Sequence, residues 1–282
     1  MLYNMLMEKK VTTNKKLTTF IFVASVCFGL FLIIAPLALG YINQKRADEA
    51  IALYDNTASQ STDAFAEEFA QAEKYNLAIA GSIRDEGQKE RYSKILDVEK
   101  GIMGYIEIPR IGIRNPIYHG VEEEVLQKGI GHLPSTSFPI GGVGNHAALS
   151  GHRGLPSSKL FTDLDRVRKD DIIVIRIMDR TLAYKVYDIE IVEPDYADGL
   201  KIDPNRDLLT LITCTPYAVN THRLLVHAER TEYKDEMSNI KTERTISESD
   251  RILLIALGVV ALILGVDIVV ILKRRRRERS RV

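Results

Sequence analysis

The sequence predicts a mainly β protein with added helices, in which a β-barrel or sandwich follows amphipathic helices and is flanked by two transmembrane helices. Short apolar runs separated by turn signals fill the chain from residue 103 to about residue 229, a pattern that is typical of all-β domains. A long, predominantly apolar stretch lies near each end, at residues 17–42 and 252–272. Each stretch reaches the length that a helix needs to cross a bilayer.

The charges around the two apolar stretches predict the topology. Four lysines stand in the N-terminal segment 1–16, and the C-terminal segment 273–282 is mostly basic. Because positive flanks stay in the cytoplasm, both termini are expected there and residues 43–251 are expected outside the cell membrane. The first stretch is longer than the apolar part of a signal peptide, so a retained anchor is favoured over cleavage near Ala38–Gly40.

Two amphipathic helices are predicted in the region 43–97, ahead of the β domain. Apolar residues recur there at helical spacing, with a break expected near 57–62. The polar segment 81–90 ends the pattern and is expected to be an exposed loop. The apolar positions are Ala47, Ile51 and Tyr54 in the first helix and Phe65, Phe69 and Ala72 in the second.

The β domain is expected at residues 98–235, and a linker at 236–251 leads from it to the second membrane span. Alternation of apolar and polar residues is clearest at Tyr184–Ile191, as expected for a strand with one buried face. One short helix is predicted between strands, at Ser158–Leu164. The predicted strands are Gly104–Ile108, Ile113–His119, His146–Ser150, Asp171–Ile177, Leu182–Val192, Leu208–Cys214 and Leu224–Glu229.

The segment Thr210–Val226 contains the group around which a site is predicted. A strand ends at Cys214, a turn follows, and a second strand begins just after Arg223. If the two strands pair, the thiol and the guanidinium lie side by side. The other cysteine, Cys27, lies in the first apolar stretch, so no disulfide is expected. An unpaired thiol in an extracytoplasmic domain indicates reactivity, and the alternative is a buried structural cysteine.

Nucleophilic cysteine catalysis also needs a proton shuttle and donors for the developing oxyanion. His152 is the favoured shuttle because it stands where an apolar strand opens into the glycine-containing loop Gly151–Gly154, a common position for active-site residues. Arg223 offers five donors that can hold a substrate carbonyl, and its alternative role is a surface salt bridge. The competing histidines are His119, His132, His222 and His227, each with a structural or surface role as the alternative.

Thr210–Cys214 resembles the TLxTC signature of the sortases, the Gram-positive cysteine transpeptidases. Arg223 stands where that family has its catalytic arginine, and Gly151-His152 matches its histidine motif. The double membrane anchor is similar to that of the class C branch, which assembles pili. Further stretches that look like class C sortases are Gly104–Pro109, Pro116–Gly120, Leu149–Pro156, Lys159–Asp165 and Asn220–Leu225.

The resemblance implies an eight-stranded sortase-type β-barrel that acts on an LPxTG-like sorting signal. Cys214 would attack the carbonyl between Thr and Gly of that signal and form a thioacyl intermediate. His152 would protonate the leaving amine and later deprotonate the incoming one, while Arg223 would position the substrate and stabilise the oxyanion. Thr213, the threonine before the cysteine, would line the pocket. No metal and no cofactor are expected, because the sequence has no metal-type Cys/His cluster and no phosphate-binding glycine loop.

One departure from the class C pattern concerns the lid. Class C sortases carry a lid between the N-terminal helices and the barrel, with an Asp-Pro-aromatic anchor over the active site. In the corresponding region, Gly81–Gly87, Asp85 is followed by Glu86 and Gly87, so the proline and the aromatic residue are missing. The lid is therefore expected to be absent, shortened or anchored differently, which weakens pilus polymerisation relative to wall anchoring.

Three functions stay open at the level of sequence. The favoured one is a membrane-bound transpeptidase that transfers the acyl group to a lysine amine of a pilin. The second keeps the chemistry but anchors surface proteins or pili to a peptidoglycan precursor of the cell wall. The third is a non-catalytic, membrane-tethered adhesin or scaffold. The expected partners are LPxTG-type proteins and the lipid bilayer, and no nucleic acid, because the basic run directly follows an apolar stretch.

Overall fold

The structure, a computed structural model of the chain, describes residues 2–60, 65–81, 91–98, 100–155, 158–194, 198–239 and 248–279. The chain divides into two compact units. One unit, Leu39–Thr245, contains the β domain, and the other consists of the terminal segments Met1–Ala38 and Ile246–Val282.

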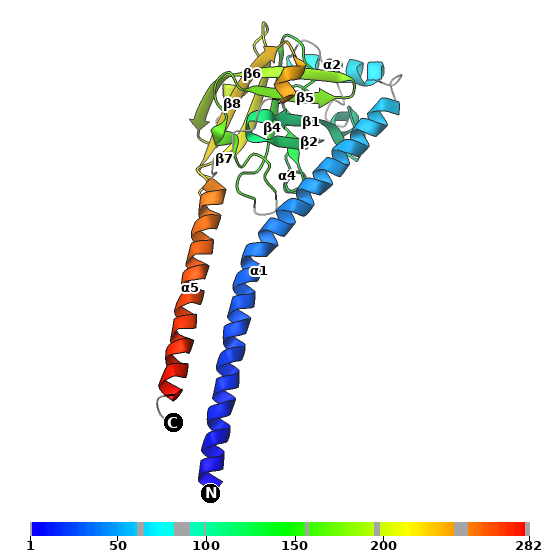
Figure 1. Ribbon diagram of the computed structural model, residues 1–282. Helices are drawn as coiled ribbons and strands as arrows, with labels where there is room; N and C mark the ends of the chain where they lie inside the picture. The colour runs from blue at the N-terminus through cyan, green and yellow to red at the C-terminus, as the bar shows by residue number, and fades with distance from the viewer. Residues whose placement is uncertain are drawn as a thin grey trace. The chain divides into compact units, whose positions relative to one another are not determined.

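Eight strands of the described chain close into a barrel in the order β1-β2-β3-β4-β7-β8-β6-β5 (Figure 1). The predicted β-barrel is confirmed, and the sandwich alternative is wrong. Neighbouring strands are antiparallel except for the parallel pairs β2–β3 and β4–β7. Closure of the sheet removes the open edges that would otherwise invite aggregation. The strands are β1 (Ile102–Ile108), β2 (Ile113–His119), β3 (Ile130–His132), β4 (Asn145–Ser150), β5 (Ile172–Ile177), β6 (Arg180–Val192), β7 (Asp207–Thr215) and β8 (His222–Thr231).

Strand β3 has no counterpart among the predicted strands. Its three residues include Gly131, and glycine weakens the propensity for a strand. The glycine is required by packing, because a Cβ at this position would collide with the carbonyl oxygen of Gly120. Close approach of two segments far apart in sequence therefore creates a strand that local propensity does not predict.

The predicted helix at Ser158–Leu164 is wrong. Residues 160–163 form turns, and only the short 3-10 helix η4 (Leu164–Arg166) follows. Leu160 has a φ of 33°, outside the right-handed helical region, and Phe161 donates its backbone N–H to the carbonyl of His152. The other short helices are α4 (Glu123–Leu126), η2 (Tyr92–Lys94), η3 (Pro109–Ile111), η5 (Asp198–Leu200) and η6 (Asp235–Asn239).

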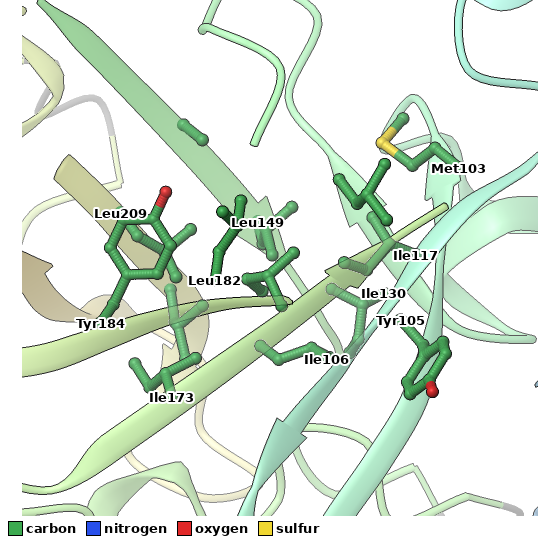
Figure 2. Packing of buried hydrophobic residues seen from close by; sticks show 14 of the residues in the cluster. Met103, Tyr105, Ile106, Ile117, Ile130, Leu149, Ile173, Leu182, Tyr184 and Leu209 are labelled. Atoms are coloured by element: carbon green, nitrogen blue, oxygen red, sulfur yellow. The ribbon is translucent and has the colours of Figure 1, made fainter. Parts of the chain in front are cut away.

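The barrel interior is the main hydrophobic core. Figure 2 shows Ile106, Ile130 and Leu149 packed together from three different strands. Alternate residues of each strand point inward, which holds for Tyr184 and Val186 in the segment 184–191. A register shift between Val186 and Asp188 then interrupts the predicted alternation, and Ile191 is exposed. Full burial of each large side chain contributes about 1.5–3 kcal/mol, and the barrel thereby forms a rigid support for groups on its outer face.

Two helices precede the barrel. Helix α1 (Leu2–Gln60) runs without a break through the predicted membrane span and the first predicted amphipathic helix, and α2 (Phe65–Ile79) follows. Much of the expected break at 57–62 is therefore helical, while residues 61–64 lie outside the described chain. The predicted apolar positions of both helices are confirmed as buried: Ala47, Ile51, Tyr54, Phe65, Phe69 and Ala72.

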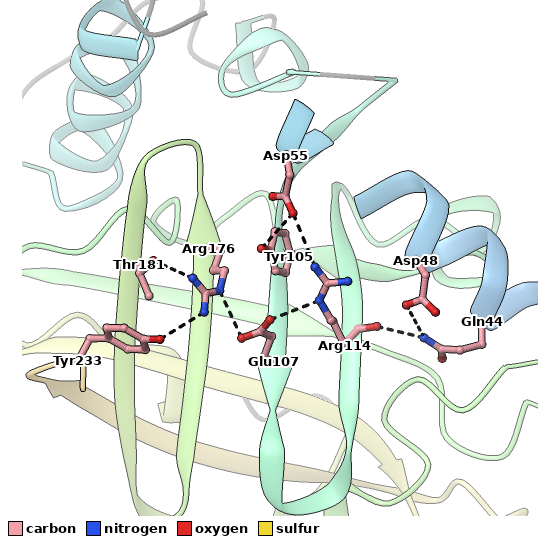
Figure 3. Close-up of polar contacts among 9 residues, drawn as sticks. All are labelled: Gln44, Asp48, Asp55, Tyr105, Glu107, Arg114, Arg176, Thr181 and Tyr233. Carbon is pink, nitrogen blue, oxygen red and sulfur yellow. Dashed lines mark hydrogen bonds and ion pairs between the residues drawn. The ribbon is translucent and has the colours of Figure 1, made fainter. Parts of the chain in front are cut away.

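Polar contacts join α1 to the first two strands (Figure 3). Glu107 of β1 lies between Arg114 and Arg176, at 3.3 Å from a nitrogen of each guanidinium. Arg114 also approaches Asp55 of α1 at 3.7 Å, and Gln44 of α1 donates to the Arg114 carbonyl. This network fixes the C-terminal part of α1, residues 39–60, against the barrel.

The structure supports one of the two predicted membrane spans. In the described residues, Thr19–Ser59 of α1 is long and apolar enough to cross a membrane. Its large apolar side chains, such as Phe20 and Phe31, are exposed, which favours an apolar surrounding. The second predicted span, 252–272, lies within helix α5 (Glu248–Arg279). Among the described residues, the apolar helical stretch found there is Leu257–Val270, so the second span stays a prediction.

Candidate active site

Strand register places Cys214 beside Arg223, and extrapolation of the register of a neighbouring strand brings His152 to the same level. Cys214 of β7 pairs directly with Arg223 of β8, which confirms that these two residues are neighbours. The parallel pair β4–β7 runs from Asn145 opposite Asp207 to Ser150 opposite Ile212. Continued by two residues, this register brings His152 to the level of Cys214.

Two of these side chains belong to the same face of the sheet, and continued alternation would place the third there. Leu149 of β4, Leu211 of β7 and Leu224 of β8 lie in the barrel core. Because side chains alternate along a strand, Cys214 and Arg223 fall on the outer face, as does His152 if the alternation of β4 continues. The Cys214 thiol is free and partly exposed. Among the described residues, no hydrogen bond joins Cys214 to His152 or Arg223, so the register alone brings these groups together.

The loop that carries His152 is attached to β7 at two points. Thr213 donates its hydroxyl to the carbonyl of Gly151, at 2.7 Å. Arg153 donates to the hydroxyl of Thr215 at 2.8 Å and forms a 2.6 Å ion pair with Asp165. Thr213 and Arg153 are both buried. These contacts position the imidazole relative to the thiol; a contact of Thr213 with substrate stays a prediction.

Glycine is required immediately before the histidine. A Cβ on Gly151 would lie 2.7 Å from Ile130 Cδ1 and 2.8 Å from Phe161 Cδ2. Both neighbours are buried, so they have no room to move. The close approach explains why a Gly-His pair stands at this position of the sequence.

Glu123 contacts His152 and was not among the predicted site residues. Its carboxylate lies 3.2 Å from Nε2 of His152 and is held in α4 (Glu123–Leu126). A hydrogen bond from Gln127, helped by His152, lowers the pKa of Glu123 below its ordinary value. The carboxylate is therefore ionised and orients the ring through Nε2. The acidic run at 122–124 was visible in the sequence, but nothing in its spacing indicated His152.

Arg223 has no acidic partner in the described part of the chain. Its guanidinium donates to the carbonyls of His222, at 3.1 Å, and Asn220, at 3.4 Å. Its predicted alternative role in a surface salt bridge is therefore not seen. A guanidinium without a carboxylate keeps donors available for an oxyanion or a substrate carbonyl.

The competing histidines have other partners. His119 contacts the carbonyls of Ile95 and Gly101, and His132 is fully buried between the Tyr92 hydroxyl and the Ser137 carbonyl. Burial lowers the pKa of His132 to about 4. His222 faces Glu193 at the surface, and His227 contacts Thr210 and Glu190. Each of these four histidines therefore has the structural or surface role that was its alternative.

The region in which a lid was expected is only partly described. Residues 82–90, which include Asp85, lie outside the described chain, whereas Arg91–Val98 are described. Ile95 and Leu96 belong to the core cluster. The predicted departure from the class C lid stays a prediction.

A partly exposed thiol and a guanidinium without an acidic partner on paired strands, with an imidazole just beyond the end of the neighbouring strand, are the groups needed for cysteine acyl transfer. The family model described as the sortase domain matches residues 106–231. A crystal structure of sortase C1 from Streptococcus agalactiae is 41% identical, with a TM-score of 0.63, and the match covers 66% of this chain and 100% of that one. The chain belongs to the sortase family.

Two further comparisons agree with this assignment. Sortase C of Streptococcus pneumoniae is 38% identical, with a TM-score of 0.60, over 66% of this chain and 97% of that one. Among curated proteins, sortase A of Streptococcus agalactiae serotype III is 33% identical over 132 residues, 45% of this chain and 52% of that protein. The chain thus spans about half the length of that curated relative.

Proposed function

We propose that this sortase is a membrane-bound cysteine transpeptidase that cleaves an LPxTG-like sorting signal between Thr and Gly and transfers the acyl group to a lysine amine of a pilin. The observation that supports it best is the direct pairing of Cys214 with Arg223, beside the strand β4 that leads to His152. No other group of the described chain combines a free, partly exposed thiol with an unpaired guanidinium.

The proposed reaction has two acyl transfers. In the first, the Cys214 thiolate attacks the Thr carbonyl carbon, and Arg223 stabilises the oxyanion that forms. The C–N bond breaks as His152 donates a proton to the leaving Gly amine, and a thioester remains. In the second, His152 accepts a proton from the incoming amine as it attacks the thioester, and the new amide bond releases the Cys214 thiolate.

The choice of a pilin as substrate is supported by the relatives. The crystal structure of Streptococcus pneumoniae sortase C is described as giving insights into pilin substrate specificity, and another neighbour is described as sortase C1 of a pilus island. The alternative acceptor is a peptidoglycan precursor, which the missing Asp-Pro-aromatic anchor favours. The partly exposed thiol and the unpaired arginine do not favour a non-catalytic adhesin or scaffold.

We also propose that both ends of the chain are anchored in the membrane, with the catalytic domain extracytoplasmic and both termini in the cytoplasm. The charge pattern supports this topology. Within the unit formed by the termini, a Cβ on Gly29 of α1 would lie 3.5 Å from Val260 of α5. Small residues are common where two membrane helices pack together, so this contact is in keeping with two spans.

The first test is Cys214→Ala in the full chain. We expect cleavage of an LPxTG peptide and the covalent acyl adduct both to disappear, because the variant has no nucleophile; the rate should fall at least about 10³-fold. Cleavage is followed by liquid chromatography and the adduct by intact mass. Cys27→Ala, which removes the chain's other cysteine, is the matched control and should behave like the wild type. Turnover by Cys214→Ala would mean that the nucleophile is wrongly assigned.

A second test separates the two acceptors. We expect the full chain, incubated with a pilin that carries the sorting signal, to produce a ladder of covalent polymers on denaturing gels. The ladder should vanish when the acceptor lysine, identified by mass spectrometry of the linkage, is changed to arginine. Wall-linked pilin in cells without any ladder would instead identify the peptidoglycan precursor as the acceptor.

A further inference from the structure

A chain of four hydrogen bonds crosses the outer face of β4, β7, β8 and β6. It begins at the carbonyl of Lys201, which lies 2.8 Å from Nδ1 of His146. Nε2 of His146 lies 2.7 Å from the hydroxyl of Thr210, and that hydroxyl lies 2.8 Å from Nδ1 of His227. Nε2 of His227 lies 3.0 Å from Glu190. His146, Thr210 and His227 are buried, so the middle of this chain of hydrogen bonds is shielded from water, whereas Glu190 is partly exposed.

This chain of hydrogen bonds runs parallel to the proposed catalytic residues His152, Cys214 and Arg223, here called the catalytic row. Three of its residues come from the strands β4, β7 and β8 that carry or lead to that row. Each of its three buried residues is separated from a catalytic residue by an even number of positions, so the side chains share a face. The spacing of four residues on β7 and β8 corresponds to about 13 Å along a strand. The pairs are His146 with His152, Thr210 with Cys214, and His227 with Arg223.

Lys201, at the start of this chain of hydrogen bonds, belongs to the connection between β6 and β7. Strand β6 ends at Val192, which pairs with Arg223 and so lies at the level of the catalytic row. The described part that leads back to β7 comprises η5 and residues 201–206, here called the 198–206 segment. It contacts β4 and is tied to the barrel by the bond between Gly144 N–H and the Arg206 carbonyl. Leu208 and Leu225 are buried although they point away from the core, so this face is covered.

The four bonds require more protons than two neutral histidines can supply. Each bond needs one hydrogen, and a neutral imidazole carries a single N–H while a hydroxyl carries one O–H. Two imidazoles and Thr210 therefore provide three hydrogens for four bonds. The Lys201 carbonyl and the Glu190 carboxylate at the two ends only accept. All four hydrogen bonds can form only if one additional proton is bound.

The additional proton belongs at the Glu190 end. Burial, followed by the charges of His227 and Arg206, lowers the pKa of His146, so a second proton there is disfavoured. His227 faces the carboxylate of Glu190 directly, and an imidazolium next to a carboxylate is the favourable arrangement. Asp188 interacts electrostatically with His227, and the Tyr187 ring lies 6.0 Å from it.

We propose that His146 and His227 are positioning residues of this sortase: His227 is held as an imidazolium by Glu190, and the completed chain of hydrogen bonds fixes the 198–206 segment over the same sheet that carries the catalytic residues, about 13 Å along the strands from Cys214 and Arg223. The directions of the bonds follow. His227 donates to Glu190 and to Thr210, Thr210 donates to His146, and His146 donates to the Lys201 carbonyl. Fixing this segment acts on substrate binding rather than on bond breaking. That kinetic consequence rests on the proposed function, whereas the proton count does not.

The proton count is tested by nuclear magnetic resonance of the full chain, labelled with ¹⁵N-histidine and purified in detergent. The six histidines are assigned by single His→Gln variants. At pH 7 we expect His227 to carry protons on both nitrogens and His146 on Nδ1 only. A neutral His227, or a doubly protonated His146, would overturn the proposal.

Glu190→Gln provides a sharper version of the same test. The amide group of glutamine can donate to Nε2 of His227, so it supplies the fourth hydrogen without an additional proton. We expect His227 to become neutral while the 198–206 segment keeps its slow hydrogen exchange. Glu193→Gln removes the carboxylate from the exposed pair with His222 and should leave His227 unchanged. A doubly protonated His227 in Glu190→Gln contradicts the proposal.

Thr210→Val interrupts the chain without a change of shape. We expect faster hydrogen exchange in the 198–206 segment and a KM for the LPxTG peptide raised about threefold to tenfold, as for the loss of a buried hydrogen bond, with kcat within about twofold. Unchanged exchange in a folded Thr210→Val protein would overturn the positioning role. If the wild type cleaves no LPxTG peptide, the proposed function is wrong. Nuclear magnetic resonance then still tests the protonation of the histidines, and hydrogen exchange still tests the attachment of the 198–206 segment.

Discussion

At the scale of single residues, the site depends on groups that differ in how they are held. The carbonyl of His152 accepts a hydrogen bond from Phe161, and its ring contacts Glu123. The residues before and after it are hydrogen-bonded to β7. Within the described chain, the Arg223 guanidinium donates to backbone carbonyls of its own turn and strand. The imidazole is therefore oriented before substrate arrives, whereas the guanidinium is available to it.

Arg223→Lys tests the role of the guanidinium. Lysine keeps the positive charge but loses the planar pair of donors that can hold a carbonyl oxygen in a fixed direction. We expect kcat/KM for the LPxTG peptide to fall about 10²-fold to 10³-fold, the usual loss for a missing oxyanion donor. Arg230→Lys, seven residues further along β8, is the matched control and should retain activity. Near-wild-type turnover of Arg223→Lys would show that charge alone suffices.

At the scale of elements, one tyrosine connects three of them. Tyr54 of α1 donates its hydroxyl to the carbonyl of Met103 in β1, at 3.0 Å, and accepts the N–H of Met178 between β5 and β6, at 2.7 Å. Burial raises the pKa of Tyr54, so the hydroxyl keeps its proton. The helix is thereby attached to the barrel by directional bonds as well as by apolar burial.

Tyr54→Phe tests how much these bonds contribute. The ring still fills its place, but Met103 and Met178 lose their partner, so we expect a loss of about 1–3 kcal/mol in the free energy of unfolding. The measurement is urea unfolding of the full chain in detergent, followed by circular dichroism. Tyr41→Phe alters an exposed tyrosine of the same helix and should have no effect. Equal midpoints for the two variants would refute the contribution of the hydroxyl.

At the scale of the whole molecule, stability depends on pH through His132. In the folded chain its Nε2 faces the Ser137 carbonyl and its Nδ1 faces the Tyr92 hydroxyl, so a neutral ring is fully satisfied. Its pKa is about 4 instead of the ordinary 6.5. Between these values the unfolded chain binds the proton and the folded chain does not, so stability falls as pH is lowered from 6.5 towards 4.

His132→Gln should flatten this dependence. Since one pKa unit corresponds to about 1.4 kcal/mol, His132 accounts for about 3 kcal/mol of the stability lost between pH 6.5 and 4. The test compares urea unfolding at several pH values in that window. The variant should be less stable at pH 7 but lose less on acidification, while His222→Gln, at the surface, should follow the wild type. Parallel curves for His132→Gln and the wild type would exclude this cause.

Sequence patterns predicted the elements whose signals are local. The strands around Cys214 and Arg223 are apolar runs with a turn between them, and their pairing follows from chain proximity. Elements with no local signal were missed or misread. Strand β3 contains a glycine, and the segment at Ser158–Leu164 has helical composition but is held in turns by Phe161 and Leu160. The contact of Glu123 with His152 joins positions 29 residues apart and had no signature.

The sequence by itself therefore determined the chemistry of this sortase: a thiol and a guanidinium on adjacent strands of one hairpin. The sequence also favoured His152 among the histidines, but only the tertiary structure decided that the strand leading to it, β4, pairs in parallel with β7, whose residues lie 62 positions further along the chain. The tertiary structure also brings His146 and His227 into one buried chain of hydrogen bonds through Thr210. Such long-range registers are set by the packing of the whole barrel, because no short stretch of sequence contains both partners.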